Sequence, residues 1–109
     1  MQILDSVEEF ILQFKSAFAD KMDIEWGFLN GNCYWFAHIL KGRFPNGVIC
    51  FVPDESHFVF LYDWGSEVRV YDIKGRCNPK SMIDWYQYQA QEPARAERIM
   101  HDCIYKYID

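Results

Sequence analysis

Apolar residues recur at helical spacing near the N-terminus of the chain. A first helix is predicted over residues 6–22, because its apolar positions return every three or four residues and share one face. Those positions are Val7, Phe10, Ile11, Phe14, Ala17 and Phe18. Ser6, followed three residues later by Glu9, fits a capping box that marks the start of this helix. We expect the apolar face to pack against the core.

Loop-forming residues separate this helix from a second one. The loop residues are Gly27, Asn30, Gly31 and Asn32. Either asparagine is suited to cap a helix over residues 33–41, and Gly42 is suited to end it. A turn at residues 45–47, with the sequence Pro-Asn-Gly, follows. This interpretation places Cys33 in the first turn of the second helix.

Three strands are predicted between residues 48 and 73. The segment VICFV (48–52) is continuously apolar, HFVFLYD (57–63) is rich in aromatic residues, and EVRVYDI (67–73) alternates. A short hairpin turn at residues 63–66 joins the last two strands, and so short a connection implies antiparallel pairing.

The C-terminal third of the chain is predicted to be helical again. Asn78-Pro79 ends the strand region, Ser81 or its neighbour caps a short helix through Gln89, and Pro93 opens a last helix. The fold class is therefore α+β: N-terminal helices packed on a small antiparallel sheet, followed by C-terminal helices. We expect a single domain over residues 1–109.

Composition and charge narrow the functional classes. Half of the 109 residues are hydrophobic and 18% are aromatic, which is typical of a folded chain. The net charge of −5 leaves no basic stripe for phosphates, so no nucleic-acid partner is expected. No apolar run reaches the length of a membrane span, and the N-terminus lacks the features of a signal peptide. We expect a cytoplasmic protein with no membrane partner, and the sequence leaves its oligomeric state open.

The four cysteines do not form a metal-binding pattern. They are Cys33, Cys50, Cys77 and Cys103. They include no C-x-x-C pair and their spacing is too wide for structural zinc, so neither a metal nor a cofactor is expected. We expect free thiols rather than disulfides in a reducing compartment. Cys50 and Cys103 lie in apolar patterns and are interpreted as packing residues.

Cys33 differs from the other cysteines because of its predicted position at a helix start. Partial positive charge and unpaired N–H groups at that end favour a thiolate and can stabilise an oxyanion. His57 opens the second predicted strand and Asp72 lies near the end of the third. Pairing of these strands about Trp64-Gly65 would bring both residues to the open end of the hairpin. Asp72 would then orient His57, and His57 would take the proton from Cys33.

Three short motifs carry a resemblance to a known superfamily. GNCYWFAHIL, HFVFLYDWG and VYDIKG, within about residues 27–75, together resemble the papain-like cysteine hydrolases, especially the small bacterial NlpC type. Transglutaminase-like proteins share the same Cys, His, Asp order. The resemblance implies a papain-like fold with a Cys33, His57 and Asp72 triad. It also implies a thiol hydrolase or acyl transferase whose substrate is a peptide, amide, thioester or ester.

The chain departs from this family at the oxyanion donor. The glutamine that usually precedes the cysteine is missing, so Asn30, Asn32 or backbone N–H groups are expected to take that role. Trp35 flanks the site and is interpreted as part of the core or of a groove wall. The chain is also too short for a second lobe, which favours a shallow groove or a site completed by a partner protein.

Two interpretations without catalysis stay open. The domain could be a protein-binding module of an immunity-like or inhibitory kind, or a subunit that dimerises through aromatic residues. The candidate anchors are Trp64, Tyr86, Tyr88 and Tyr105. His38 lies five residues after Cys33 and is interpreted as a core or interface residue, and His101 as a solvated one.

Overall fold

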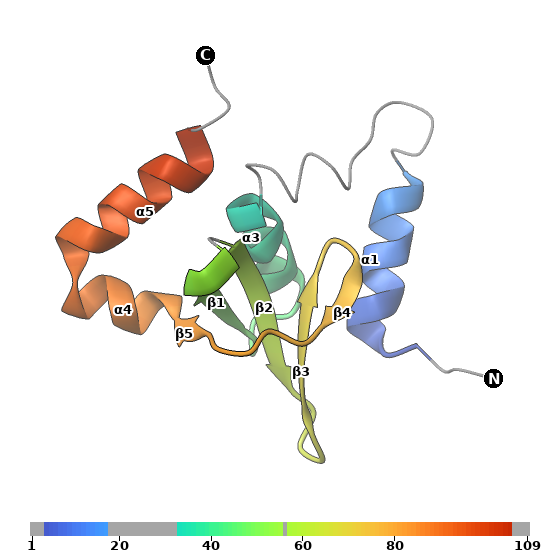
Figure 1. The fold of residues 1–109 in the computed structure, drawn as a ribbon. Coiled ribbons are helices and arrows are strands. Elements are labelled where there is room, and N and C mark those ends of the chain that lie inside the picture. Colours follow the sequence, from blue (N-terminus) through green and yellow to red (C-terminus); the bar gives the residue numbers. More distant parts are fainter. Residues whose placement is uncertain (1–3, 18–32, 56, 106–109) are drawn as a thin grey trace.

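The described part of the chain forms an α+β arrangement. A computed structural model describes residues 4–17, 33–55 and 57–105, with only the backbone described for residues 102–105. These residues contain four α-helices and a five-stranded antiparallel sheet with the strand order β4-β3-β2-β1-β5. Figure 1 shows helices on both flanks of this sheet and one helix across its face. The predicted α+β class is confirmed.

The sheet contains the three predicted strands and two short ones at its edges. The strands are β1 (Val48–Val52), β2 (His57–Asp63), β3 (Val68–Asp72), β4 (Gly75–Cys77) and β5 (Ile83–Asp84). The third predicted strand is one residue shorter at each end than expected. β4 and β5 were not predicted, because segments of three and two residues carry no hydrophobic period.

The β2–β3 hairpin closes one residue later than predicted. The backbone N–H of Trp64 donates to the Glu67 carbonyl, so Gly65 and Ser66 form the two-residue loop. Gly65 has φ +90°, which suits the first loop position of a hairpin turn where glycine is favoured. Phe60 consequently pairs with Tyr71 rather than with residue 69.

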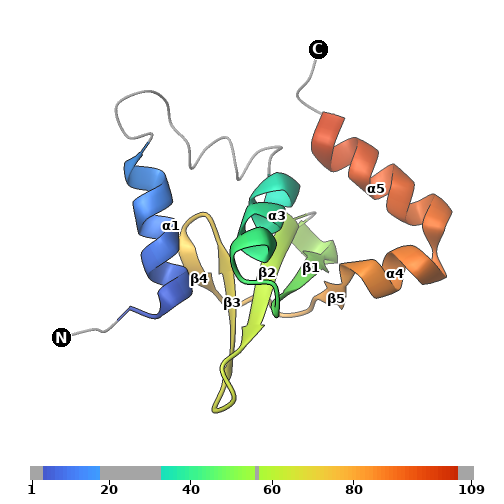
Figure 2. The same ribbon diagram turned by 180° about the vertical axis from the view of Figure 1, so that it is seen from behind.

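Helix α3 (Cys33–Arg43) covers one face of the sheet. Its buried residues Phe36 and Leu40 pack in one cluster with Phe60, and Ala37 packs in a second cluster with Phe58. Figures 1 and 2 show α3 on one side of β2 and the connection from β4 to β5 on the other. Gly42 lies inside the last turn of α3, so it does not end the helix as predicted.

The opposite face of the sheet is covered by the connection between β4 and β5. Residues 78–82 run across this face in both views of the fold (Figures 1 and 2). Met82 packs there against a cluster of buried residues from β1, β2 and β3. The members of that cluster are Cys50, Val52, Val59 and Val70.

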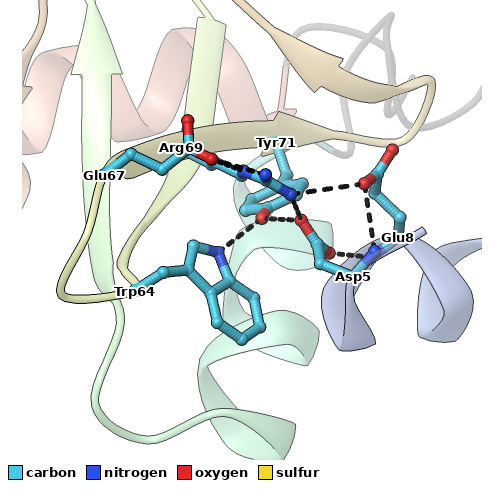
Figure 3. A network of polar contacts seen from close by, with 6 residues as sticks. All are labelled: Asp5, Glu8, Trp64, Glu67, Arg69 and Tyr71. Carbon is cyan, nitrogen blue, oxygen red and sulfur yellow. Dashed lines mark hydrogen bonds and ion pairs between the residues drawn. The ribbon is translucent and has the colours of Figure 1, made fainter. Parts of the chain in front are cut away.

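Helix α1 (Ser6–Ser16) is fixed to β3 through a polar network at its first turn. The cap is Asp5 rather than Ser6: its side chain accepts from the Glu8 N–H at 2.7 Å, and the Glu8 side chain accepts from the Asp5 N–H. Asp5 also accepts hydrogen bonds from Tyr71 and from Arg69 (Figure 3). The sequence predicts the cap one residue too late, at Ser6, because serine is as good a capping residue as aspartate. The predicted residues 18–22 lie outside the described part.

The C-terminal helices pack beside β1 and α3. Asp84 caps α4 (Trp85–Gln91) by accepting from the Gln87 N–H, so this helix begins later than the predicted Ser81 cap. Helix α5 (Pro93–Tyr105) begins at the predicted proline. The fully buried Trp85 joins both helices to the cluster beneath the first turn of α3. Among the described residues, no helix combines the length and the apolar composition that a membrane span requires.

Candidate functional site

The residues predicted to act together lie at one end of the sheet. Cys33 is the first residue of α3, His57 the first of β2 and Asp72 the last of β3. In Figure 1 the start of α3, the start of β2 and the end of β3 all lie at this end. Three segments that are distant along the chain therefore bring a thiol, an imidazole and a carboxylate to one place.

His57 and Asp72 form a direct side-chain contact. His57 Nε2 lies 3.3 Å from Asp72 Oδ2, and both side chains are largely buried. Continuing the β2–β3 register places Asp72 opposite Val59, so His57 and Asp72 are diagonal neighbours on one face rather than a directly opposed pair. The two-residue hairpin loop explains this offset from the predicted pairing.

A tight turn fixes the orientation of the Asp72 carboxylate. Its second oxygen, Oδ1, accepts a hydrogen bond of 2.8 Å from the backbone N–H of Lys74. Both oxygens are thus engaged, one by the turn that leads into β4 and one by the imidazole. The backbone hydrogen bond in this turn therefore fixes the orientation of the Asp72 carboxylate towards His57.

The His57 ring also interacts with Cys33. Burial alone would lower the pKa of His57, but hydrogen bonds with Asp72 and Cys33 and the charges of the same two groups raise that pKa to about 9. The imidazole therefore interacts with both the carboxylate of Asp72 and the thiol of Cys33.

Cys33 itself is held in an apolar and aromatic environment. Its exposed fraction is 5%, and it belongs to a buried cluster with Tyr34, Phe58 and Trp85. Its position at the first residue of α3 places it beside backbone N–H groups that have no partner within the helix. A small reactive group that reaches the sulfur would thus meet few competing waters and several N–H donors.

The other described cysteines have different surroundings. Cys33, Cys50 and Cys77 are all free thiols. Burial, followed by the charge of Asp84, raises the pKa of Cys50 to about 11. Burial, followed by the charges of Asp72 and Glu55, raises the pKa of Cys77 to about 12. No histidine is among the groups that raise these two pKa values. The side chain of Cys103 lies outside the described residues.

Of the remaining predicted site residues, the described structure includes Trp35 alone. Asn30 and Asn32 lie outside the described residues. Trp35 is 48% exposed and packs on Tyr34 and His38 at the edge of the core, so it is not a buried core residue, and its interpretation as part of a groove wall stays a prediction.

The candidate aromatic anchors also differ from expectation. Trp64 is partly buried against Tyr62 and donates to the Tyr71 hydroxyl, and Tyr88 packs against the core cluster. Tyr86 is exposed as expected, and the side chain of Tyr105 lies outside the described residues.

Sequence reasoning missed Cys77 as a neighbour of the site. The charge of Glu55, in the short 3₁₀ helix η1 (Pro53–Glu55), contributes to the raised pKa of Cys77. Cys77 reaches Asp72 because β4 pairs with β3, and Asp72 pairs with Gly75 in that register. Gly75, which follows Asp72-Ile73-Lys74, is the sequence feature from which the β3–β4 hairpin could have been predicted.

Comparisons with known proteins assign the family. A search of curated proteins and a search of solved structures each find no match for this chain. The model of the family described as Phage YunG-like protein matches residues 10–103, which include all three residues of the site and most of the described fold. The chain therefore belongs to the Phage YunG-like protein family.

Proposed function

We propose that the protein is a small papain-like thiol hydrolase or acyl transferase. Its substrate would be an amide, a thioester or an ester. Cys33 is the nucleophile, His57 is the general base and then the general acid, and Asp72 orients the ring. The observation that carries this proposal is the position of His57, whose Nε2 lies 3.3 Å from Asp72 Oδ2 and whose pKa is raised by its interactions with both Asp72 and Cys33.

The first half of the reaction forms an acyl-enzyme. His57 holds the proton taken from Cys33, as its pKa of about 9 favours at pH 7, and the sulfur forms a bond to the carbonyl carbon of the substrate. The first-turn N–H groups of α3 are the donors available for the resulting oxyanion. The intermediate collapses as the bond to the leaving group breaks, and His57 returns the proton to that group. General acid–base help of this kind typically contributes about 10²–10⁴-fold in rate.

The second half returns the free thiol. A water molecule, or an amine or alcohol acceptor, loses a proton to His57 and attacks the acyl carbon. The carbon–sulfur bond then breaks and the sulfur recovers its proton. Water gives hydrolysis and another acceptor gives acyl transfer. The same residues catalyse hydrolysis and acyl transfer. The outcome therefore depends on whether water or another acceptor reaches the acyl-enzyme.

The proposal is tested by trapping the acyl-enzyme. The protein is incubated with p-nitrophenyl acetate at pH 7, and the acetylated residue is located by mass spectrometry. We expect acetylation at Cys33 that is lost in Cys33→Ser and reduced at least about tenfold in His57→Gln. A matched control, Cys50→Ser, should keep the reaction. Acetylation spread equally over the cysteines would exclude a catalytic thiol.

The alternative is a protein-binding module on the same fold. The exposed Trp35 and Tyr86 favour it, because such side chains are common at binding surfaces. Absence of any acyl adduct at Cys33, together with a folded protein, would support this alternative over catalysis.

A further inference from the structure

Two exposed aromatic side chains from different helices surround one histidine. Trp35 on α3 is 48% exposed and Tyr86 on α4 is 46% exposed. Their ring centroids lie 6.3 Å and 6.4 Å from the His38 ring. Tyr34 packs against the same ring at 4.4 Å. We refer to Tyr34, Trp35, His38 and Tyr86 as the aromatic patch.

The aromatic patch is a concentration of exposed apolar surface. Four large hydrophobic side chains are exposed among the described residues, and two of them belong to the patch. The other two lie apart on α1 and β3. Single exposed apolar residues need no explanation, but convergence of two from separate helices on one ring indicates a binding surface.

The charges around the patch favour a cation. Helix α4 contains no charged residue, and its two caps are Asp84 and Glu92. Burial lowers the pKa of His38, so its ring is neutral near pH 7 and does not repel a positive charge. The whole chain carries a net charge of −5. A positively charged group is therefore attracted towards the patch rather than repelled from it.

His38 also has an unpaired ring nitrogen. Its Nε2 atom is buried and has no hydrogen-bond partner in the described part of the chain. In the tautomer that carries the proton on Nδ1, Nε2 accepts a hydrogen bond, and ammonium and guanidinium groups are donors only. Because Nε2 is buried, a basic side chain pairs with it only when the neighbouring rings move aside.

We propose that the aromatic patch binds a lysine or arginine side chain on an extended segment of a partner protein. The rings of Trp35 and Tyr86 would hold the cation through cation–π contacts. A second copy of this chain is a poorer occupant, since each copy carries −5 and two exposed side chains fall well short of the roughly 800 Å² that each partner of a standard interface buries. This proposal does not depend on chemistry at Cys33.

The proposal is tested with short peptides and the Cys33→Ser variant, which cannot turn over a substrate. Three peptides of the form acetyl-Gly-Gly-X-Gly-Gly-amide carry lysine, norleucine or glutamate at X. Binding is followed by NMR through the indole N–H signals. We expect the lysine peptide to bind about fivefold more tightly than the norleucine peptide, and the glutamate peptide to show no binding.

Variants locate the binding. Trp35→Ala and Tyr86→Ala should each weaken binding of the lysine peptide about fivefold, whereas Tyr86→Phe should keep it because the ring remains. Leu12→Ala removes an equally exposed apolar side chain on α1 and should have no effect. Equal affinity for lysine and norleucine, or unchanged binding in Trp35→Ala, would overturn the proposal. The peptide affinities and the effects of these variants do not depend on whether Cys33 forms an acyl-enzyme.

Discussion

His57 Nε2 lies 3.3 Å from Asp72 Oδ2, although the two residues are diagonal neighbours across the β2–β3 hairpin. The contact depends on the turn after Asp72, where the Lys74 N–H holds the other carboxylate oxygen. Together with the interaction with Cys33, this contact raises the pKa of the imidazole.

Replacing Asp72 by Asn should lower the pKa of His57. The pKa of about 9 arises because Asp72 and Cys33 outweigh the effect of burial. Loss of the carboxylate charge should lower this pKa by at least about one unit. The measurement is an NMR titration of the His57 Cε1 proton, assigned with His57→Gln. Asp54→Asn removes an exposed carboxylate from η1 and should leave the titration unchanged.

The free energy of unfolding should depend on pH through His57. An unfolded histidine has a pKa of about 6.5, and the folded value is raised to about 9. The stabilisation is therefore complete below about pH 6.5 and is lost as pH rises through about 9. Urea unfolding should show wild type losing on the order of 1–3 kcal/mol relative to His57→Gln between these pH values. Parallel curves for the two proteins would contradict the raised pKa.

Asp5 should contribute more to stability than Ser6. Asp5 caps α1 and accepts hydrogen bonds from Tyr71 and Arg69, whereas Ser6 is exposed. Asp5→Ala should lower the free energy of unfolding by about 2–3 kcal/mol, because it removes a cap, leaves the Tyr71 hydroxyl without its acceptor and removes one of the ion-pair partners of Arg69. Ser6→Ala should change it by less than about 0.5 kcal/mol. Urea unfolding of both variants at pH 7 measures the difference, and equal losses would favour the cap predicted from sequence.

Two glycines offer a matched test of packing on the sheet. A Cβ atom on Gly47 would lie 1.9 Å from Cζ of the buried Phe60 ring, whereas one on Gly42 meets nothing within 4 Å. Gly47→Ala should therefore cost about 1–3 kcal/mol, because the ring must move in a packed core. Gly42→Ala lies in the last turn of α3 and should stabilise the protein by up to about 1 kcal/mol. Thermal unfolding distinguishes the two, and a neutral Gly47→Ala would show that Phe60 is loosely packed.

The sequence predicts the elements of this fold better than it predicts their ends. Strands β1 and β2 follow from continuous apolar runs bounded by turn residues, and the start of α3 follows from the loop before Cys33. Edge strands β4 and β5 are too short to have a period. The sequence predicts the caps at Ser6 and at Ser81 or its neighbour, whereas the structure has them at Asp5 and Asp84, because several neighbouring residues can cap a helix and only tertiary contacts choose among them.

The sequence predicts which residues make up the candidate site, but it does not predict how they are arranged in space. The order of Cys33, His57 and Asp72 along predicted elements suggests the meeting of three side chains. The register of the hairpin depends on whether Trp64 or Gly65 begins the loop, and a backbone hydrogen bond between Trp64 and Glu67 decides it. The exposure of Trp35 was not predictable, because it depends on how α4 and α5 pack beside α3.

The central claim is that His57 activates one thiol among several. It is tested most directly by the rates at which iodoacetamide alkylates each cysteine at pH 7, measured by peptide mapping. Cys50 and Cys77, with pKa values raised to about 11 and about 12, should remain thiols and react slowly. We predict that Cys33 reacts at least about tenfold faster than either, and that His57→Gln removes this advantage. Equal rates at Cys33, Cys50 and Cys77, or a fast Cys33 in His57→Gln, would contradict the account.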